Sequence, residues 1–374
     1  MIGDDDRPIA SRSGANAAGC DIKSLDAEET ERWVESLGLD RYRGRQIRQW
    51  LFKRLEVDFD RMHTLPRSAR KLLEQSAFIT DLKLLSTATS GDTTRKFLFE
   101  LADGHTIETV LIPERDHLTV CISSQVGCAM GCRFCLTATQ GLIRNLAPSE
   151  IIDQVIQVKR MLENPDRLTN IVLMGMGEPL ANYGAVTRAV KNILSTDGLD
   201  FSHRRVTLST CGLVPGMVQL GADLTVNLAV SLNAANDETR SYLMPVNKIH
   251  PIGKLLAACR SFPLPNRRMI TFEYILIDGI NDSDRDALQL SRILSGIRAK
   301  INLIALNPHP GSPMAPPPLE RILSFQQILI DNNYTAVIRK SKGRDILAAC
   351  GQLKSSFDRG SVEGSVLDKK PSLE

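Results

Sequence analysis

Four of the eight cysteines fall within fifteen consecutive residues, and the last three of them have the spacing C-x3-C-x2-C. Thiolates are preferred ligands of iron–sulfur clusters, and a short loop can wrap three of them around one face of a [4Fe–4S] cube. Gly127 and Gly131 give the loop the backbone freedom that this wrapping needs. Because the cube has four irons, three cysteines leave one iron open to a small chelating molecule. The four cysteines are Cys121, Cys128, Cys132 and Cys135, and the last three are the predicted cluster ligands.

A zinc site is the alternative interpretation of this loop. Structural zinc usually has four ligands in two pairs, and the sequence offers no second Cys or His pair at suitable spacing. The nearest histidine, His117, lies at the far end of the preceding predicted strand. Eight cysteines in a reducing compartment do not indicate a disulfide scaffold, so Cys20, Cys211 and Cys259 are interpreted as inert thiols.

The elements around the loop divide the chain into five parts. Residues 1–24 and 356–374 are polar, and we expect both segments to be flexible. Residues 25–80 carry apolar side chains at helical spacing and predict a small helical domain, whose third helix begins near Pro66. Residues 81–113 predict a linking β-hairpin, with strands at 96–101 and 106–111 joined by a type I′ turn at Asp103-Gly104.

From residue 117 onward, short β-branched runs alternate with helical ones. This alternation favours an α/β fold with a parallel sheet, and about six units predict a partial (β/α)6 barrel over residues 114–355. In such barrels the chemistry gathers at the C-terminal ends of the strands. Ser149 is the predicted N-cap of the first helix. Predicted strands are 118–123, 170–174, 205–209, 225–231, 270–276, 301–306 and 336–339; predicted helices are 149–162, 183–195, 251–262, 284–297 and 319–332.

With Phe134 just before its last cysteine, the loop resembles the signature of radical S-adenosylmethionine (SAM) enzymes. That resemblance implies that the open iron binds the amino and carboxylate groups of SAM. It also implies that an electron from the cluster cleaves SAM and releases a 5′-deoxyadenosyl radical. The second predicted strand ends in Met-Gly-Met-Gly-Glu-Pro, where Gly177 and Glu178 match the segment that binds the methionyl ammonium in this superfamily.

Further stretches resemble one family more narrowly. Residues 206–212, 230–234 and 307–311 place small polar groups at strand ends, and residues 339–353 contain Arg-Lys-Ser-Lys-Gly-Arg-Asp and Ala-Ala-Cys-Gly-Gln-Leu. Together they resemble the dual-specificity methyltransferases that modify carbon 2 of adenine in 23S ribosomal RNA and in transfer RNA. The resemblance covers residues 25–355, with Cys211 where serine is expected. The SAM contacts that it implies are Gly177, Glu178, Ser209, Ser231, Leu232, Asn233 and Asn307.

The same resemblance implies the catalytic residues. Cys350 matches the cysteine that carries the methyl group as S-methylcysteine, at a cost of two SAM molecules per methylation. Cys121 matches the cysteine that resolves the enzyme–RNA adduct by forming a disulfide with Cys350. Glu108 matches the proton acceptor, although a thiolate at Cys121 could remove the proton instead. Which of the two is the base stays open at this point.

The expected partners follow from this reaction. They are 23S rRNA, tRNA and an electron donor such as flavodoxin, and the target adenine must be unstacked. The net charge of +3 is too small to indicate RNA binding, but residues 41–54 hold six basic residues and no acid. This run, with Arg339, Lys340, Lys342 and Arg344, is interpreted as phosphate contacts or as solvated surface.

No apolar run reaches the roughly 18–20 residues of a membrane span, so we expect a cytoplasmic protein without membrane contact, and a monomer. Two alternatives remain open beside the carbon-2 methyltransferase. One is the related enzyme of the antibiotic-resistance type, which methylates carbon 8 of adenine in ribosomal RNA. The other is a non-catalytic iron–sulfur or zinc module that binds RNA.

Overall fold

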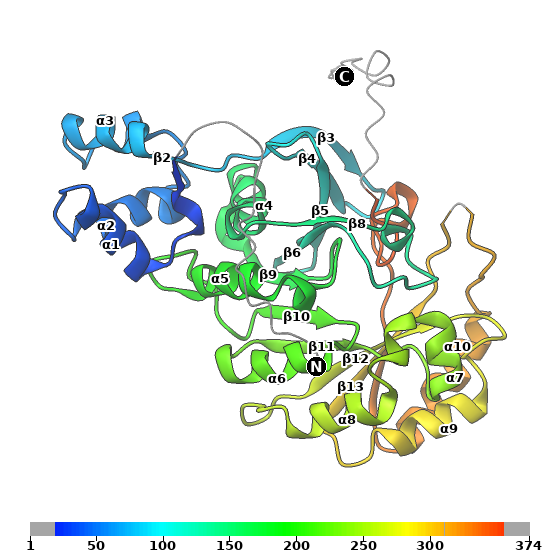
Figure 1. Cartoon of the computed structure of the whole chain (residues 1–374). Helices are drawn as coiled ribbons and strands as arrows, with labels where there is room; N and C mark the ends of the chain where they lie inside the picture. The colour runs from blue at the N-terminus through cyan, green and yellow to red at the C-terminus, as the bar shows by residue number, and fades with distance from the viewer. Residues whose placement is uncertain (1–18, 310, 355–374) are drawn as a thin grey trace, which may run out of the picture.

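The computed structural model describes residues 19–309 and 311–354, and within them ten strands form one sheet in the order β14-β13-β12-β11-β10-β9-β6-β5-β4-β3 (Figure 1). The strands from β6 to β14 in this sheet run parallel to one another, and β3, β4 and β5 extend it antiparallel at one edge. In the described part of the chain β14 and β3 are its two edges, so the barrel is open. The predicted α/β fold with a partial barrel is therefore confirmed. The parallel strands are β6 Leu118–Cys121, β9 Leu168–Leu173, β10 Val206–Thr210, β11 Asn227–Ser231, β12 Ile270–Leu276, β13 Ala299–Ala305 and β14 Thr335–Ile338.

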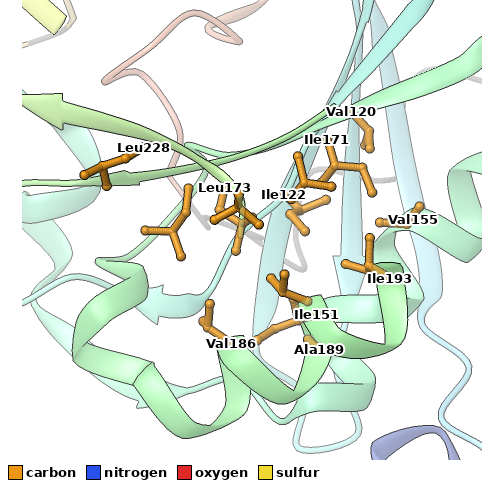
Figure 2. Close-up of a cluster of buried hydrophobic side chains, with 14 of the residues drawn as sticks. Val120, Ile122, Ile151, Val155, Ile171, Leu173, Val186, Ala189, Ile193 and Leu228 are labelled. Atoms are coloured by element: carbon orange, nitrogen blue, oxygen red, sulfur yellow. The ribbon is translucent and has the colours of Figure 1, made fainter. Parts of the chain in front are cut away.

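Helices follow most of the parallel strands and cover them with apolar side chains. In Figure 2, Ile151 and Val155 of one helix, and Val186 and Ile193 of the next, face strand residues such as Ile171, and all five are fully or almost fully buried. Each such side chain contributes about 1.5–3 kcal/mol through burial, which fixes the strand ends that carry the site. The helices are α4 Pro148–Arg160, α5 Tyr183–Leu194, α6 Val214–Asp223, α7 Asp237–Leu243, α8 Ile252–Ser261, α9 Asp284–Ile293 and α10 Leu319–Asp331.

The start of α4 differs from the prediction. Its N-cap is Ala147, and Pro148 stands at the first helical position, where its missing N–H costs nothing. Glu150 accepts a hydrogen bond from the Ala147 N–H. The predicted cap, Ser149, lies inside the first turn and is fully buried.

The N-terminal unit groups α1 (Ala27–Ser36), α2 (Arg43–Arg48) and α3 (Arg67–Ser76) beside the barrel, in blue and cyan in Figure 1. The expected flexibility is wrong for residues 20–24. Strand β1 (Cys20–Asp21) pairs in parallel with β2 (Ala77–Phe78), and Ile22 is fully buried, so burial of an apolar side chain orders this segment. Residues 1–18 and the predicted tail 356–374 lie outside the described residues.

The predicted hairpin is part of the main sheet. It comprises β3 (Lys83–Thr89), β4 (Arg95–Glu100) and β5 (Thr106–Pro113), and β5 pairs with β6. The turn between β4 and β5 is not type I′, because Gly104 has a positive φ (82°) and Asp103 does not. Gly104 N–H donates to Leu101 O, and Leu101 N–H donates to His105 O, which closes a three-residue loop. None of the helices in the described residues has the length and apolar content of a membrane span.

Candidate active site

The three predicted cluster cysteines lie together on the wall of one pocket at the C-terminal ends of the parallel strands. Their loop leaves strand β7 (Gln125–Gly127), which pairs antiparallel with β8 (Leu142–Asn145). Gly127 has a φ of 75°, and a Cβ there would lie 1.9 Å from the carbonyl oxygen of Gly141. The Cys128 N–H donates to this same oxygen at 2.9 Å. Only glycine fits at position 127, because any side chain there would collide with Gly141. The cluster loop begins at this close contact.

The donor set fits a [4Fe–4S] cluster. Burial raises the pKa of the Cys132 thiol, and charges on Cys135 and Cys128 raise it further; burial also raises the pKa of Cys128, to about 11. The thiols are thus close enough to interact, and a cationic cluster would offset the cost of ionising them. Within the described residues, no group of three or more His, Cys, Asp or Glu side chains is arranged to hold a single metal ion. In a cube each thiolate binds a separate iron, so the sulfurs need not converge on one point.

Several predicted SAM contacts come together in this pocket, beyond strands β9, β10 and β11. Glu178 is buried, and its carboxylate oxygens accept hydrogen bonds from the N–H groups of Leu180 (3.0 Å) and Cys211 (2.7 Å). Burial raises the pKa of Glu178, while these hydrogen bonds lower it. The lining residues predicted from the sequence are Gly177, Glu178, Ser209, Ser231 and Asn233.

Two other predicted contacts lie elsewhere. The side chain of Leu232 is fully buried in the hydrophobic core. Asn307 donates a hydrogen bond from Nδ2 to the carbonyl oxygen of Cys350, at 3.2 Å. Asn307 therefore holds the segment that carries Cys350.

The structure adds Arg240, which the sequence analysis did not identify. This arginine is fully buried and donates to the carbonyl oxygens of Cys211 (2.7 Å) and Leu232 (3.1 Å), so it joins the ends of β10 and β11 behind the pocket. Its helix, α7, is short and polar, and no sequence signal marked its arginine as buried. Cys211 is itself buried, and burial raises the pKa of its thiol, which agrees with an inert cysteine.

Cys121 and Cys350 line the same pocket as the cluster cysteines, although 229 positions separate them in the chain. Cys121 ends β6 and is buried. It packs in one apolar cluster with Ala348 and Leu353, which lie on either side of Cys350 in the chain. Every cysteine in the described residues is a free thiol. Burial raises the pKa of Cys121, and a charge on Cys350 raises it further. The side chain of Cys350 is exposed to the pocket, yet the surrounding protein raises the pKa of its thiol to about 11.

Glu108 lies apart from these two thiols, in an adjoining cavity. It is buried on β5, and its Oε1 forms an ion pair with Lys96 Nζ at 2.8 Å. Its Oε2 accepts a hydrogen bond from the Lys354 N–H, also at 2.8 Å. Burial raises the pKa of Glu108, and the Lys96 charge opposes this shift. The structure thus does not bring Glu108 into one pocket with Cys121 and Cys350.

A second acid, Glu273 on β12, was missed by the sequence analysis and does line the main pocket. Asn302 Nδ2 donates to its Oε1 at 2.9 Å, and burial raises the pKa of its carboxyl. Its charge raises the pKa of Cys350, whereas the charge of Arg339 lowers it. The sequence offered one signal for this residue, because Glu273 is the single acid in the otherwise apolar strand Ile270–Leu276.

The predicted phosphate contacts divide into two groups. Arg339, Lys340 and Lys342 line the pocket that holds Cys350. In the basic run 41–54, however, Arg48 is fully buried and donates to Asp197 (2.9 Å) and Asn192 (2.8 Å). Its assignment as a phosphate contact is wrong, because its guanidinium is used inside the protein.

Comparison with known proteins agrees with this geometry. Residues 122–290 match the radical SAM superfamily, and residues 20–79 match the "Ribosomal RNA large subunit methyltransferase N-terminal domain". The chain is 53% identical over 332 residues to the dual-specificity RNA methyltransferase RlmN of Syntrophus aciditrophicus, covering 89% of this chain and 95% of the relative. The RlmN of Desulfosudis oleivorans is 52% identical, with 91% and 92% covered. A crystal structure of a radical SAM methyltransferase from Sphaerobacter thermophilus superposes with a TM-score of 0.86 at 46% identity, covering 90% of this chain and all of that one.

Proposed function

Since the chain belongs to the RlmN family of radical SAM RNA methyltransferases, we propose that it methylates carbon 2 of adenine in 23S rRNA and in tRNA. The resemblance predicted from the sequence is confirmed by this membership. The observation that carries the proposal is the pair of free thiols, Cys121 and Cys350, on the pocket that also holds the three cluster cysteines. Carbon 2 of adenine is electrophilic, so direct displacement on a sulfonium methyl group cannot methylate it. A protein thiol that carries the methyl group first removes this obstacle.

Cys128, Cys132 and Cys135 would hold the cluster, which with SAM supplies the methyl group and a 5′-deoxyadenosyl radical. The sulfur of Cys350 receives the methyl group. This S-methyl group then loses one hydrogen atom to the radical. The resulting carbon radical bonds to carbon 2 of adenine and joins enzyme and RNA covalently. Two SAM molecules are consumed in each cycle.

Release of the product is assigned to Cys121. The radical adduct must give up one electron, for which the oxidised cluster would serve as the acceptor, and a base removes the proton from carbon 2. The thiolate of Cys121 then attacks the sulfur of Cys350, so that the S–C bond breaks and a disulfide forms. The carbon keeps the electron pair and is protonated to a methyl group. The position of Cys121 on the shared pocket, and of Glu108 outside it, favours Cys121 as the base as well. The proton that Cys121 takes from carbon 2 would then pass to the leaving carbon as the sulfur of Cys121 bonds to that of Cys350.

The substrates follow from the same site. Arg339, Lys340 and Lys342 on the pocket wall would bind phosphates of an RNA whose target adenine is unstacked. A reducing protein such as a flavodoxin would deliver the electron for each cleavage of SAM.

Mass spectrometry of the anaerobically reconstituted enzyme and of RNA digests after turnover tests the proposal. We expect a methyl group on Cys350, and 2-methyladenosine in both 23S rRNA and tRNA. Formation of 8-methyladenosine would assign the chain to the carbon-8 alternative. If neither a modified base nor methyl-Cys350 appeared, the proposed chemistry would be wrong and a non-catalytic RNA-binding module would remain.

A further inference from the structure

We propose that the ion pair between Lys96 and Glu108 is a clamp that holds residues 343–354, the Cys350 segment, over the pocket. In this assignment, which rests on the proposed role of Cys350, Glu108 is a positioning residue and not the proton acceptor. The segment follows β14 and is red in Figure 1. The clamp residues come from β4 and β5, 251 and 246 positions before the residues that they bind.

Each member of the pair also binds the backbone of the Cys350 segment. Lys96 Nζ donates to the carbonyl oxygen of Leu347 at 3.2 Å, three residues before Cys350. The Lys354 N–H donates to Glu108 Oε2 at 2.8 Å, four residues after Cys350. The ion pair itself, at 2.8 Å, links the two contacts, and the side chains of Lys96 and Glu108 are 16% and 6% exposed. Both carboxylate oxygens of Glu108 are thus engaged, and the contacts straddle the reactive cysteine.

The backbone of the segment depends on such contacts. Apart from a single turn at Arg344–Ile346 it has no regular structure among the described residues, and Leu347 has a left-handed φ of 53°. That conformation costs a non-glycine residue about 1–2 kcal/mol, and Lys96 binds the carbonyl group of this same residue. The clamp therefore acts at the one non-glycine residue of the described segment 343–354 that has a left-handed backbone.

The cluster loop holds the other side of the segment. Leu136 N–H donates to the Gly351 carbonyl oxygen at 2.7 Å, and Thr137 Oγ1 donates to the Leu353 carbonyl oxygen at 2.6 Å. The segment is thus suspended between the cluster loop and the antiparallel edge of the sheet. Asp345 also accepts hydrogen bonds from Ser90 Oγ (2.5 Å) and the Gly91 N–H (3.1 Å) at the antiparallel edge. Loss of the clamp therefore frees Leu347 and Lys354 on either side of Cys350, while the start of the segment and its contacts with the cluster loop stay in place.

The position of Cys350 matters because its sulfur must meet three groups in turn: the methyl donor, the adenine and Cys121. A misplacement of about 1 Å is enough to lower such rates by roughly 100-fold. A buried ion pair adds little to stability, but it fixes one geometry when its remaining hydrogen bonds are satisfied. The Lys96–Glu108 pair meets that condition through the backbone of the Cys350 segment.

The test uses the reconstituted full-length enzyme with the variants Glu108→Gln and Lys96→Met. The matched control is Lys83→Met, which breaks the Lys83–Glu100 pair (2.9 Å) of the same antiparallel strands, away from the segment. Hydrogen exchange of the peptide covering 343–354 is measured together with the rate of methylation at Cys350. We expect the backbone amides of this peptide to exchange faster in both clamp variants. The rate of methylation at Cys350 should fall by roughly tenfold or more. Lys83→Met should behave as the wild type.

A role of Glu108 as proton acceptor gives a different result. Glu108→Gln would then exchange and methylate as the wild type and would accumulate a covalent enzyme–RNA adduct, while Lys96→Met would not; this outcome overturns the clamp. Unchanged exchange of peptides from β12 and β13 verifies that the variants fold. If the wild type itself carried no methyl-Cys350, the proposed function would fail, and the exchange data would still decide whether the clamp exists.

Discussion

At the residue scale, two opposite charges act on the thiol of Cys350. The negative charge of Glu273 raises its pKa and the positive charge of Arg339 lowers it. Desolvation of the thiol by the surrounding protein has the larger effect, and the pKa is raised to about 11. Glu273→Gln should therefore lower the pKa of Cys350, and Arg339→Ala should raise it. Since each pKa unit changes the thiolate fraction about tenfold, alkylation of Cys350 by iodoacetamide near neutral pH should be faster in the first variant and slower in the second.

The measurement is mass spectrometry of the Cys350 peptide from the cluster-free protein, alkylated over a series of pH values. Glu320→Gln, at the start of α10, serves as a control for the loss of one negative charge at a residue that does not line the pocket. Equal alkylation profiles for Glu273→Gln and the wild type would show that Glu273 does not act on Cys350.

Cys121 permits a second prediction at this scale. Cys121→Ala should still methylate Cys350 and join it to RNA, but should not release the product, because no second thiol can form the disulfide. Denaturing gels of the reaction should show a covalent protein–RNA band. Cys259→Ala removes another buried thiol, on α8, and should release methylated RNA as the wild type does. Free methylated product from Cys121→Ala would contradict the assigned role.

At the element scale, the cluster loop depends on the close approach of β7 and β8. Gly127→Ala would place a Cβ 1.9 Å from Gly141 O at a φ of 75°, so the loop must shift and the three thiols with it. We expect this variant to retain far less iron after anaerobic reconstitution. Gly104→Ala is the matched control, since its φ is 82° but no atom lies within 4 Å of the added Cβ. Equal iron content in the two variants would mean that the close contact between Gly127 and the carbonyl oxygen of Gly141 does not shape the cluster site.

Sequence patterns predicted the elements that bury regular apolar faces and missed those that do not. Strand β12 matches its predicted range because Ile270–Leu276 is an almost continuous apolar run. Helix α6 was missed because Val-Pro-Gly opens it and only Met217 and Leu220 are buried. Helix α7 was missed because it is short and buries an arginine, Arg240, beside Leu243.

The candidate site follows the same division. Its cysteines and strand-end residues were predictable, because motif spacing and strand order bring them to one edge of the sheet. The pair of Glu108 with Lys96 follows from the register of β4 and β5, but the hydrogen bond of Glu108 with the backbone of Lys354, 246 positions away, was not predictable. Long-range contacts of this kind leave no local pattern in the sequence.

At the scale of the whole molecule, buried charges join the N-terminal unit to the barrel. Lys23 forms a fully buried ion pair with Asp153 of α4. Arg48 of α2 binds Asn192 of α5, Asp197 after that helix and the Leu25 carbonyl oxygen. Burial lowers the pKa of Arg48, and the charge of Asp197 opposes this shift. The unit that the family comparison associates with ribosomal RNA methyltransferases is thus joined to the barrel through α4 and α5.

This attachment gives the last prediction. Arg48→Met should destabilise the protein by about 1–3 kcal/mol, because it leaves the buried Asn192 without one partner and Asp197, whose side chain is 33% exposed, without its charge partner. Arg45→Met, on the same helix, breaks only the exposed pair with Glu31 and should cost about 1 kcal/mol or less. Urea unfolding compares the two free energies, and tRNA binding should weaken in the first variant under conditions where the barrel remains folded. Equal losses of stability would show that Arg48 does not hold the N-terminal unit to the barrel.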